Sequence, residues 1–459
     1  MSKNEKGFAI SAIIYSLIIL FLVLMLLTLS MLSSRKVIID KQKTDVLNKI
    51  NGSSESKISY KESILNGAYP VIYNNLVAVT IEDDGTVKKA DTSKEWYNYS
   101  NKKWANAVIL IGEDTYNVED TIPEENIESY FVWIPKYSYK LWDLGNYSTS
   151  LTNHVTGNAQ SIDIKFGIDN TSDLNDGECT APLSTGTVGN CKIGDYMTHP
   201  AFITMNTTGL WVGKFETSGS VDKITIKPNL TSLRNINVKT MFETSYNYNR
   251  DLDSHMMKNT EWGAVAYLSH SNYGINKEIN INNNSSYLTG YSSINKSSGV
   301  TGTETTVTLP YDTTIGYTSS STGNITGIYD LSGGGFEYMA SYINGKLGSS
   351  GLNSNNIGSY GDKYFDVYHN ESNINSYNFR ILGDAIGEVG PFNYYSDESS
   401  GLKYRNSWYN DRSNFISSDY PWLIRGDVNY GGEAASQFSF DSQDGTSKEE
   451  FTFRIVLAP

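Results

Sequence analysis

An uncharged, apolar segment near the N-terminus constrains this chain more than any other feature. No charged side chain occurs between Phe8 and Ser34, and two basic residues, Arg35 and Lys36, follow directly. As an α-helix the segment would reach roughly 40 Å, more than the ~30 Å hydrocarbon core of a bilayer. A cleaved secretory signal has a shorter apolar core of about 7–15 residues. We therefore expect a transmembrane helix over 8–34.

The residues before this segment resemble the leader of type IV prepilins. The sequence MSKNEKG is short, carries two lysines and ends in glycine directly before Phe8. The resemblance implies cleavage between Gly7 and Phe8 by a prepilin peptidase, with pilus subunits as further partners. The chain departs from the family at Ala12, where pilins usually carry Glu, so the sequence does not decide whether it polymerises into pili. A plain membrane anchor is the alternative.

The orientation across the membrane does not follow from charge alone. Lys and Arg near the ends of a transmembrane helix favour the cytoplasmic side. More of them follow the segment than precede it: Arg35, Lys36, Lys41, Lys43 and Lys49, against Lys3 and Lys6. That bias puts the large C-terminal part inside the cell, whereas the prepilin resemblance and the composition favour the opposite. We expect a single-pass protein of the cell membrane whose C-terminal domain is extracytoplasmic, at the cell surface.

The composition of the body favours short strands and turns. Of the 459 residues 33 are tyrosine and only 10 are proline, and Asn, Ser, Thr and Gly are frequent. Tyr and Thr favour strands, whereas Ser, Asn and Gly favour turns. The length allows two or three domains. Because nucleic-acid binding needs clustered Lys and Arg, the net charge of −14 argues against a nucleic-acid partner.

The only two cysteines, Cys179 and Cys191, lie in a loop rich in Gly, Thr and Ser. A pair that closes a short loop is typical of a disulfide in an oxidising compartment. Two free thiols are the alternative, which we consider less favoured. A zinc site would need further ligands close by, and His199 is the only histidine near the pair. The sequence thus predicts a Cys179–Cys191 disulfide.

Changes in pattern along the chain divide it into five parts. We expect a leader over 1–7, the transmembrane helix over 8–34, a helical stalk over 35–54, a small β-region over 55–128 and a larger domain over 129–459. Within the larger domain, residues 281–327 are polar enough to be an insert. Within the β-region, the turn at Asp84-Gly85 predicts a hairpin.

Aromatic side chains follow closely after that hairpin. The segment EWYNYSNKKWANAV contains Trp96, Tyr97, Tyr99 and Trp104, interleaved with Asn and Lys. Such aromatics can bind sugars by stacking, or they can form the core of a small hairpin. The core interpretation is favoured.

Five further segments, in this order, resemble the formylglycine-generating-enzyme-like branch of the C-type lectin fold. They are GLWVGKFETS, KNTEWGAVAYL, GIYDLSGGGFEYMASY, WLIRGD and FTFRIVLA. The resemblance implies an α+β fold, a mixed domain of short strands and loops. The residues NTEWGAVAYL themselves predict a helix over 259–268, with Asn259 as N-cap and Glu261 in the first turn. The resemblance covers the chain from Phe131 to Leu457 outside the insert, and the same scaffold also serves as a receptor-binding module.

The chain departs from that family at the positions that carry the family's chemistry. The oxidase members hold copper with a C-terminal cysteine pair, and this chain has no cysteine after Cys191. Gly334 stands where the family has Asn, and Glu337-Tyr338 stands where it has Glu-Trp. We therefore expect no cofactor, and no specific residues support calcium.

No catalytic constellation stands out from the sequence. The motifs HExxH, GxSxG and CxxC are absent. His255 is best explained as a hydrogen-bonded scaffold histidine, and Asp251 and Asp253 as turn residues rather than calcium ligands. The tripeptide 425–427 reads Arg-Gly-Asp, but Arg425 is better explained as structural. We expect a protein that is not an enzyme.

The C-terminal surface is the predicted binding site. The run YRNSWYNDRSNFISSDYPW mixes aromatic, amide and hydroxyl side chains without a hydrophobic period, as adaptable binding surfaces do. The candidate residues are Tyr409, Asn410, Asp411, Asn429 and Tyr430. We expect a membrane-anchored or pilus-associated bacterial surface protein with a lectin-like domain for adhesion or recognition, whose partner is a host or bacterial surface protein or glycan. A minor pilin with an assembly role and an extracytoplasmic enzyme on the same fold are the alternatives.

Overall fold

The computed structural model describes residues 68–73, 75–142, 159–166, 196–294, 308–368, 383–386, 409 and 411–458. The chain divides into two compact units, Met1–Lys61 and Glu62–Pro459. All described residues belong to the second unit.

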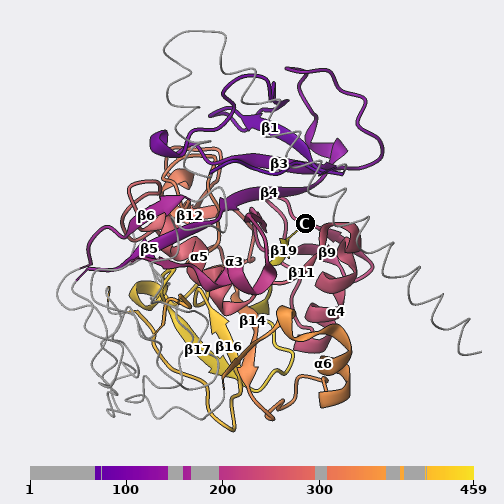
Figure 1. Cartoon of the computed structure of the whole chain (residues 1–459), viewed down its shortest axis with the longest axis vertical. Helices are drawn as coiled ribbons and strands as arrows, with labels where there is room; N and C mark the ends of the chain where they lie inside the picture. Colours follow the sequence, from indigo (N-terminus) through magenta and orange to yellow (C-terminus); the bar gives the residue numbers. More distant parts are fainter. Residues whose placement is uncertain are drawn as a thin grey trace, which may run out of the picture. The chain divides into compact units, whose positions relative to one another are not determined.

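The largest sheet of this unit has seven antiparallel strands (Figure 1). Most of its strands are short, continuous apolar runs, the pattern of strands buried on both faces. In sheet order they are β11 (His255–Met256), β19 (Ile455–Leu457), β8 (Gly209–Gly213), β4 (Ile127–Pro135), β3 (Asn106–Leu110), β1 (Val77–Ile81) and β2 (Val87–Lys89). The predicted hairpin is confirmed, because β1 pairs with β2 around Gly85, whose φ of +84° suits glycine.

A second sheet has five strands and mixed direction. Its central strand β14 (Phe336–Ile343) pairs antiparallel with β16 (Trp422–Arg425) on one edge. On the other edge, β15 (Asp366–Tyr368) and β18 (Phe451–Thr452) both run parallel to β14, at opposite ends of it. The fifth strand, β17 (Phe440–Gln443), pairs antiparallel with β16.

Smaller elements surround the two sheets. A three-stranded sheet has the order β6 (Asp163–Phe166), β5 (Tyr137–Lys140) and β7 (Met197–Thr198). Two further sheets are antiparallel pairs. One pairs β9 (Ser218–Ser220) with β10 (Lys223–Thr225), and the other pairs β12 (Tyr291–Ser293) with β13 (Thr308–Pro310). The helices are α3 (Pro200–Met205), α4 (Val238–Tyr248), α5 (Asn259–Ser269) and α6 (Ser354–Tyr360). Short 3₁₀ turns are η1 (Tyr99–Asn101), η2 (Glu124–Asn126), η3 (Arg250–Leu252), η4 (Gly316–Ser319), η5 (Asp362–Tyr364) and η7 (Gly432–Ala434).

Helix α5 lies between the two main sheets and contacts β4 on one side and β14 on the other (Figure 1). All its residues are buried, so it has no polar face. Close packing depends on Gly263, because a Cβ there would lie 1.9 Å from the carbonyl oxygen of Gly383. The helix predicted over 259–268 is confirmed, although its N-cap is Lys258 rather than Asn259.

The buried start of α5 finds its hydrogen-bond partners outside the helix. The backbone N–H of Thr260 donates to Asp366 Oδ2 at 2.7 Å, and that of Asn259 donates to Ser341 Oγ at 2.9 Å. Glu261 accepts from the backbone N–H of Lys258 at 2.8 Å. The first N–H groups of a helix have no partner within it, and carboxylates at this end are favoured by the helix dipole. The burial of α5 therefore depends on β14 and β15.

A buried arginine joins the two main sheets. Arg454 donates through Nε to Glu337 Oε2 on β14 at 3.0 Å, and its terminal nitrogens donate to the carbonyl of Gly213 on β8 at 2.8 Å and of Tyr329 at 3.0 Å. Both Arg454 and Glu337 are fully buried. Because each charge would be uncompensated without the other, the pair couples the position of β14 to that of β8.

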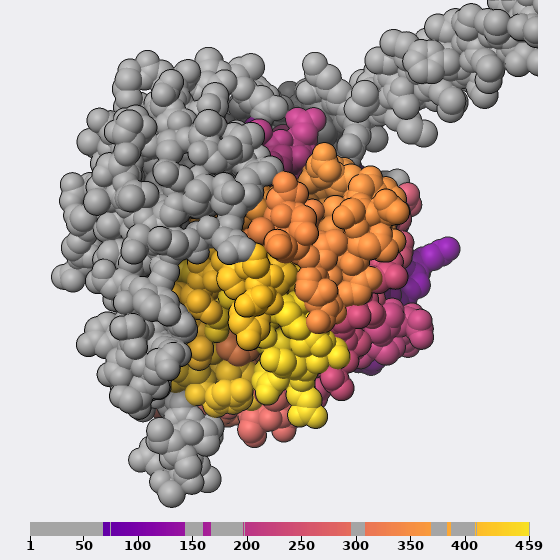
Figure 2. Space-filling model, turned by 90° about the horizontal axis from the view of Figure 1, so that it is seen from below, coloured from indigo at the N-terminus to yellow at the C-terminus, as the bar shows by residue number. Residues whose placement is uncertain are grey.

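The C-terminal strands and the α6 region share one face of the molecule, yellow beside orange in Figure 2. Backbone hydrogen bonds connect them: the N–H of Ser349 donates to the carbonyl of Asp444 at 2.6 Å. The start of α4 joins the same face, because the N–H of Val238 donates to the carbonyl of Gly445 at 3.2 Å.

The structure corrects the predicted fold class and membrane localisation. The described residues form mostly short strands and small sheets with few helices, and none of those helices is long and apolar enough to cross a membrane. The longest, α4 and α5, have 11 residues each, whereas a bilayer needs about 20. The predicted leader, transmembrane helix and stalk over 1–54, with the cleavage site Gly7-Phe8, lie outside the described residues. We do not retain the transmembrane helix, the single-pass topology or the pilin assignment.

The disulfide prediction is not retained either. No disulfide occurs among the residues that the structure describes. Cys179 and Cys191 themselves both fall outside the described ranges.

The Arg454–Glu337 pair generates a prediction on stability. We expect Arg454→Met to lower the free energy of unfolding by about 3–5 kcal/mol, because it leaves Glu337 buried without its cation. Lys88→Met is the matched control, since Lys88 pairs with Glu82 at 3.1 Å on the surface and its loss should cost under ~1 kcal/mol. Urea unfolding of both variants measures the difference. An equal loss of unfolding free energy in the two variants would contradict the coupling of the sheets through the Arg454–Glu337 pair.

His199 generates a prediction on pH. It caps α3, accepting from the N–H of Ala201 through Nδ1 at 3.3 Å, and aromatic rings enclose it: Tyr137, Tyr139, Phe202 and Tyr267. Burial lowers its pKa to about 3. Between that value and the ordinary value near 6.5, the unfolded chain binds a proton that the folded chain does not, so stability falls as the pH falls.

Protonation of His199 in the unfolded chain should lower the free energy of unfolding by about 2 kcal/mol at pH ~5 relative to pH ~6.5. We expect His199→Phe to show a shallower decline of the free energy of unfolding over that window. Phe202→Leu, which keeps His199 but loosens the same cluster, should keep the wild-type slope. The same slope in His199→Phe and in the wild type would contradict the assignment.

Candidate functional site

The predicted C-terminal face is only partly a surface. The ring of Tyr409 is half-buried and stacks on Phe438 with the centroids 6.4 Å apart, and its hydroxyl is hydrogen bonded to His270 Nε2. Asp411 is fully buried and accepts from Ser436 Oγ at 2.6 Å. Asn410 lies outside the described residues. Tyr409 and Asp411 are therefore packing residues.

The other two predicted residues lie elsewhere on the fold. Asn429 is buried, and its side-chain amide donates to the carbonyl of Asn284 at 2.8 Å. Tyr430 is 55% exposed. Of the four described candidates, only Tyr430 presents a side chain that a ligand could cover without displacing the core.

The residues that the sequence suggested as scaffold have structural contacts. His255 is buried, and its ring nitrogens lie 2.8 Å from the carbonyl of Asp253 and 2.9 Å from Glu261 Oε1. The carboxylate of Asp253 pairs with Lys363 at 2.5 Å and with Arg250 at 3.3 Å. These contacts fit a scaffold histidine and a turn aspartate.

The Arg-Gly-Asp tripeptide is not available to a partner. Arg425 is fully buried and Asp427 is 1% exposed. Asp427 pairs with Arg412 Nε at 2.7 Å. The structural interpretation of Arg425 is confirmed.

A cavity of about 440 Å³ opens beside strand β1, and we refer to it as the β1 cavity. It collects residues from β1 and its following turn, from the aromatic segment, and from a distant loop: Val79, Thr80, Ile81, Glu82, Asp83, Glu95, Trp96, Tyr97, Lys103, Trp104, Asn106, Glu119, Asn324, Ile325 and Thr326. Its volume lies within the range of small-ligand sites, about 300–1,000 Å³.

Trp96 differs from the other aromatics of its segment. Tyr97, Tyr99 and Trp104 are each 1% exposed, which confirms the favoured interpretation of these three as core. Trp96 remains half-buried and packs edge-on against Tyr97, with the ring centroids 5.1 Å apart. Trp96 thus borders the cavity, and part of its side chain stays open to solvent.

A buried lysine fixes the far wall of the β1 cavity. Lys214 donates through Nζ to Asn106 Oδ1 at 2.9 Å and to the carbonyls of Ile325 at 2.6 Å and Gly327 at 2.9 Å. It is fully buried, and burial lowers its pKa well below the ordinary value. Because Asn106 and Ile325 both line the cavity, this lysine ties the loop around Ile325 to strand β3.

The cavity is acidic. Glu82, Asp83, Glu95 and Glu119 line it with one lysine, Lys103, and all five side chains are exposed to solvent. Only Glu82 forms an ion pair with a described cation, Lys88, at 3.1 Å. No sequence pattern pointed to this set, because the four carboxylates come from three separate segments and the run EDDG reads as a hairpin turn.

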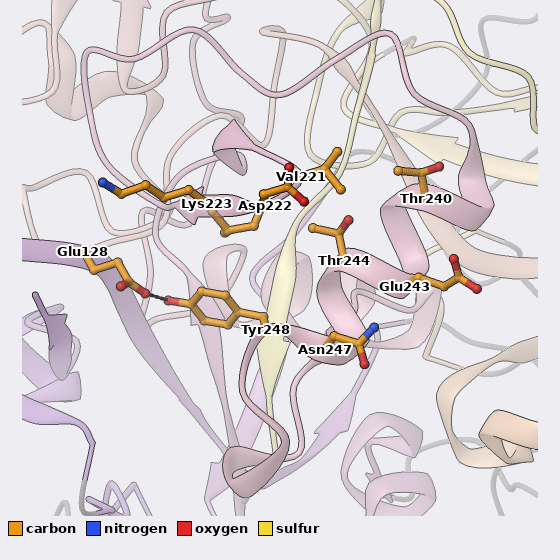
Figure 3. A pocket seen from close by; sticks show the side chains of 10 residues that line it. Glu128, Val221, Asp222, Lys223, Thr240, Glu243, Thr244, Asn247 and Tyr248 are labelled. Carbon is orange, nitrogen blue, oxygen red and sulfur yellow. Dashed lines mark hydrogen bonds between the residues drawn. The ribbon is translucent and has the colours of Figure 1, made fainter.

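A second cavity of about 500 Å³ lies between the β9–β10 hairpin and helix α4, and we refer to it as the α4 groove. Figure 3 shows Asp222 and Lys223 on the hairpin side and a row of helix side chains facing them. Thr240, Glu243, Thr244, Asn247 and Tyr248 form that row, at the three- and four-residue spacing of one helix face.

Tyrosine hydroxyls already engage two of the three carboxylates of the α4 groove, Glu128 and Glu243. Tyr248 donates to Glu128 Oε1 at 3.0 Å, as the dashed line in Figure 3 marks, and Tyr360 donates to Glu243 Oε1 at 2.7 Å. Burial raises the pKa of Tyr248, so its hydroxyl keeps its proton. No tryptophan is among the described residues that line the groove. The β1 cavity is therefore the better candidate for a ligand with an apolar face.

The residues present do not fit the calcium that the family resemblance leaves open. At Gly334, where that family has Asn, φ is +74° and a Cβ would lie 2.4 Å from Glu216 Oε1. Across the described part of the chain, no three or more His, Cys, Asp or Glu side chains gather closely enough to hold a metal ion.

The comparisons with known proteins return no relationship: no family model matches this chain, and no curated protein matches its sequence.

The different settings of Tyr409 and Tyr430 generate a prediction. We expect Tyr409→Ala to lower the free energy of unfolding by about 2 kcal/mol or more, because it removes a ring packed on Phe438. Tyr430→Ala should stay within ~0.5 kcal/mol of the wild type, since its ring is mostly in solvent. Urea unfolding of the two matched variants measures this. A neutral Tyr409→Ala would restore this residue as a surface candidate.

Proposed function

We propose that this protein is a recognition protein that binds a saccharide in the β1 cavity. The observation that carries the proposal is Trp96, a partly exposed indole on the wall of a cavity that also offers carboxylates, amides and hydroxyls beside the apolar side chains of Val79, Ile81 and Ile325. A flat aromatic ring covers the C–H face of a sugar, and the polar groups around it exchange hydrogen bonds with the hydroxyls. This combination of one apolar surface and many polar groups suits a saccharide better than a wholly apolar ligand.

The rigid surroundings of the cavity support a binding role. Strand β1 and the segment around Trp104 belong to the main sheet and its core, and Lys214 holds the opposite loop. Binding sites are commonly loops positioned by such a scaffold. The resemblance of five sequence segments to the formylglycine-generating-enzyme-like branch of the C-type lectin fold would agree with this role, because that scaffold serves as a receptor-binding module.

Exposure of the carboxylates favours binding over hydrolysis. Glycoside hydrolysis requires one carboxylic acid whose pKa burial or a close like charge raises, paired with a second carboxylate at a fixed separation. Glu82, Asp83, Glu95 and Glu119 are all exposed to solvent. Side chains in water suit hydrogen bonding to hydroxyls better than proton donation to a leaving group.

The proposal predicts that Trp96→Ala weakens saccharide binding at least about tenfold, the loss of roughly 1.4 kcal/mol of aromatic contact. A glycan array with the full-length wild-type chain identifies the saccharide, and titration calorimetry with it measures the dissociation constant of each variant. Unfolding curves of Trp96→Ala check that the fold survives.

Tyr430→Ala is the matched control, because it removes an exposed aromatic ring outside the β1 cavity. Unchanged binding in this control together with loss in Trp96→Ala would support the cavity. Loss in Tyr430→Ala with normal binding in Trp96→Ala would move the site to the C-terminal face. Consumption of the saccharide, followed by chromatography, would favour the enzyme alternative.

A further inference from the structure

We infer that the saccharide of the β1 cavity carries a free ammonium group, as a deacetylated amino sugar does. This inference rests on the proposed function and names the substrate class of the same site. Its basis is the combination of an indole ring and an excess of carboxylates over cations on the walls of one cavity.

The balance of charge in the cavity is negative. Four carboxylates face one lysine, Lys103. Lys88 compensates Glu82, and Glu95 Oε1 accepts from the side-chain amide of Asn98 at 3.1 Å. Within the described residues, no Lys or Arg pairs with Asp83, Glu95 or Glu119. A ligand that brings its own positive charge would therefore meet three carboxylates with no protein cation in direct contact, although Lys94, which pairs with Asp91, acts on Glu119 from beyond ion-pair distance.

Trp96 adds a second preference for a cation. An ammonium group near the face of a tryptophan is attracted by the ring quadrupole, and tryptophan is the best of the aromatic side chains for this interaction. The same face covers the apolar side of the sugar ring. An N-acetyl group removes the charge, and a uronic acid would place a further carboxylate among those of the cavity. Both should bind more weakly than the free amine.

The preference should depend on salt, because the carboxylates are exposed. Ion pairs in water are screened by dissolved ions, and the Debye length shrinks from roughly 30 Å at 0.01 M to about 3 Å at 1 M. The contact of the sugar with Trp96 does not depend on ionic strength in this way. Raising the salt concentration should therefore reduce the advantage of the amino sugar while leaving part of the affinity.

The test compares oligosaccharides that differ only in acetylation. Glucosamine trimers and N-acetylglucosamine trimers are titrated into the full-length protein in buffer just below neutral pH, where the amine carries its proton. We expect the free amine to bind roughly tenfold more tightly at low salt. The double variant Asp83→Asn with Glu119→Gln should lose most of that preference. Glu125→Gln with Asp222→Asn removes the same charge from exposed positions outside the cavity and should keep it.

The outcomes separate this inference from the proposed function. Equal binding of the two trimers, with loss in Trp96→Ala, would overturn the amino-sugar preference and keep the saccharide site. No binding of any saccharide on the array would overturn both. Spermidine serves as a cation without a sugar ring: if it binds as tightly as the glucosamine trimer and Trp96→Ala leaves both unchanged, the site selects charge alone and the inference fails.

Discussion

The burial of helix α5 is the constraint on which the rest of the fold depends. A helix without a solvent face must find partners for every polar group at its start, and Asp366 and Ser341 supply them from β15 and β14. The positions of β14 and β15 are therefore set by hydrogen bonds as well as by packing. A side chain at position 263 would collide with the backbone of Gly383. Glycine at this position therefore allows α5 to pack closely against that segment. The hydrogen bonds to Asp366 and Ser341 hold the five-stranded sheet in place against the N-terminal end of α5.

Buried cations extend this arrangement outward from the core. Arg454 spans from Glu337 on β14 to the carbonyl of Gly213 on β8, so the two sheets share one ion pair. Lys214 follows Gly213 directly in the chain and reaches Asn106 and Ile325 at the wall of the β1 cavity. Two adjacent positions at the end of β8 thus connect the centre of the molecule to its candidate site. A cavity wall held in this way is pre-organised, which reduces the entropy that a ligand would have to remove on binding.

Patterns that are local in the chain predicted the fold best. The hairpin around Gly85 and a helix over 259–268 were both predicted, because turn glycines, capping residues and short apolar runs act over a few residues. The binding surface was predicted less well. Tyr409 and Asp411 looked like surface residues among amides and serines, but His270 and Ser436, distant in sequence, bury them. The carboxylates of the β1 cavity escaped notice for the same reason, since only tertiary structure brings Glu119 to Asp83. Trp96 was one of four aromatics considered for sugar stacking, and the core interpretation was favoured for all four, because nothing in the sequence separated it from its buried neighbours.

The two cavities show how hydrogen bonding decides which acidic site is open to a ligand. In the α4 groove, Tyr248 and Tyr360 hold Glu128 and Glu243, so part of each carboxylate's capacity is used within the protein. In the β1 cavity, the internal hydrogen bonds fall mainly on amides and backbone carbonyls, as at Asn324, whose amide donates to the carbonyl of Lys102 at 2.9 Å. Of the carboxylates there, Glu82 and Glu95 each accept one bond, from Lys88 and Asn98. The side chains of Asp83 and Glu119 accept none from the described residues and keep their acceptor capacity for a bound molecule. Because water competes for exposed acceptors, such a site gains little from any single contact and depends on several acting together with one apolar surface. In this chain the indole of Trp96 supplies that surface.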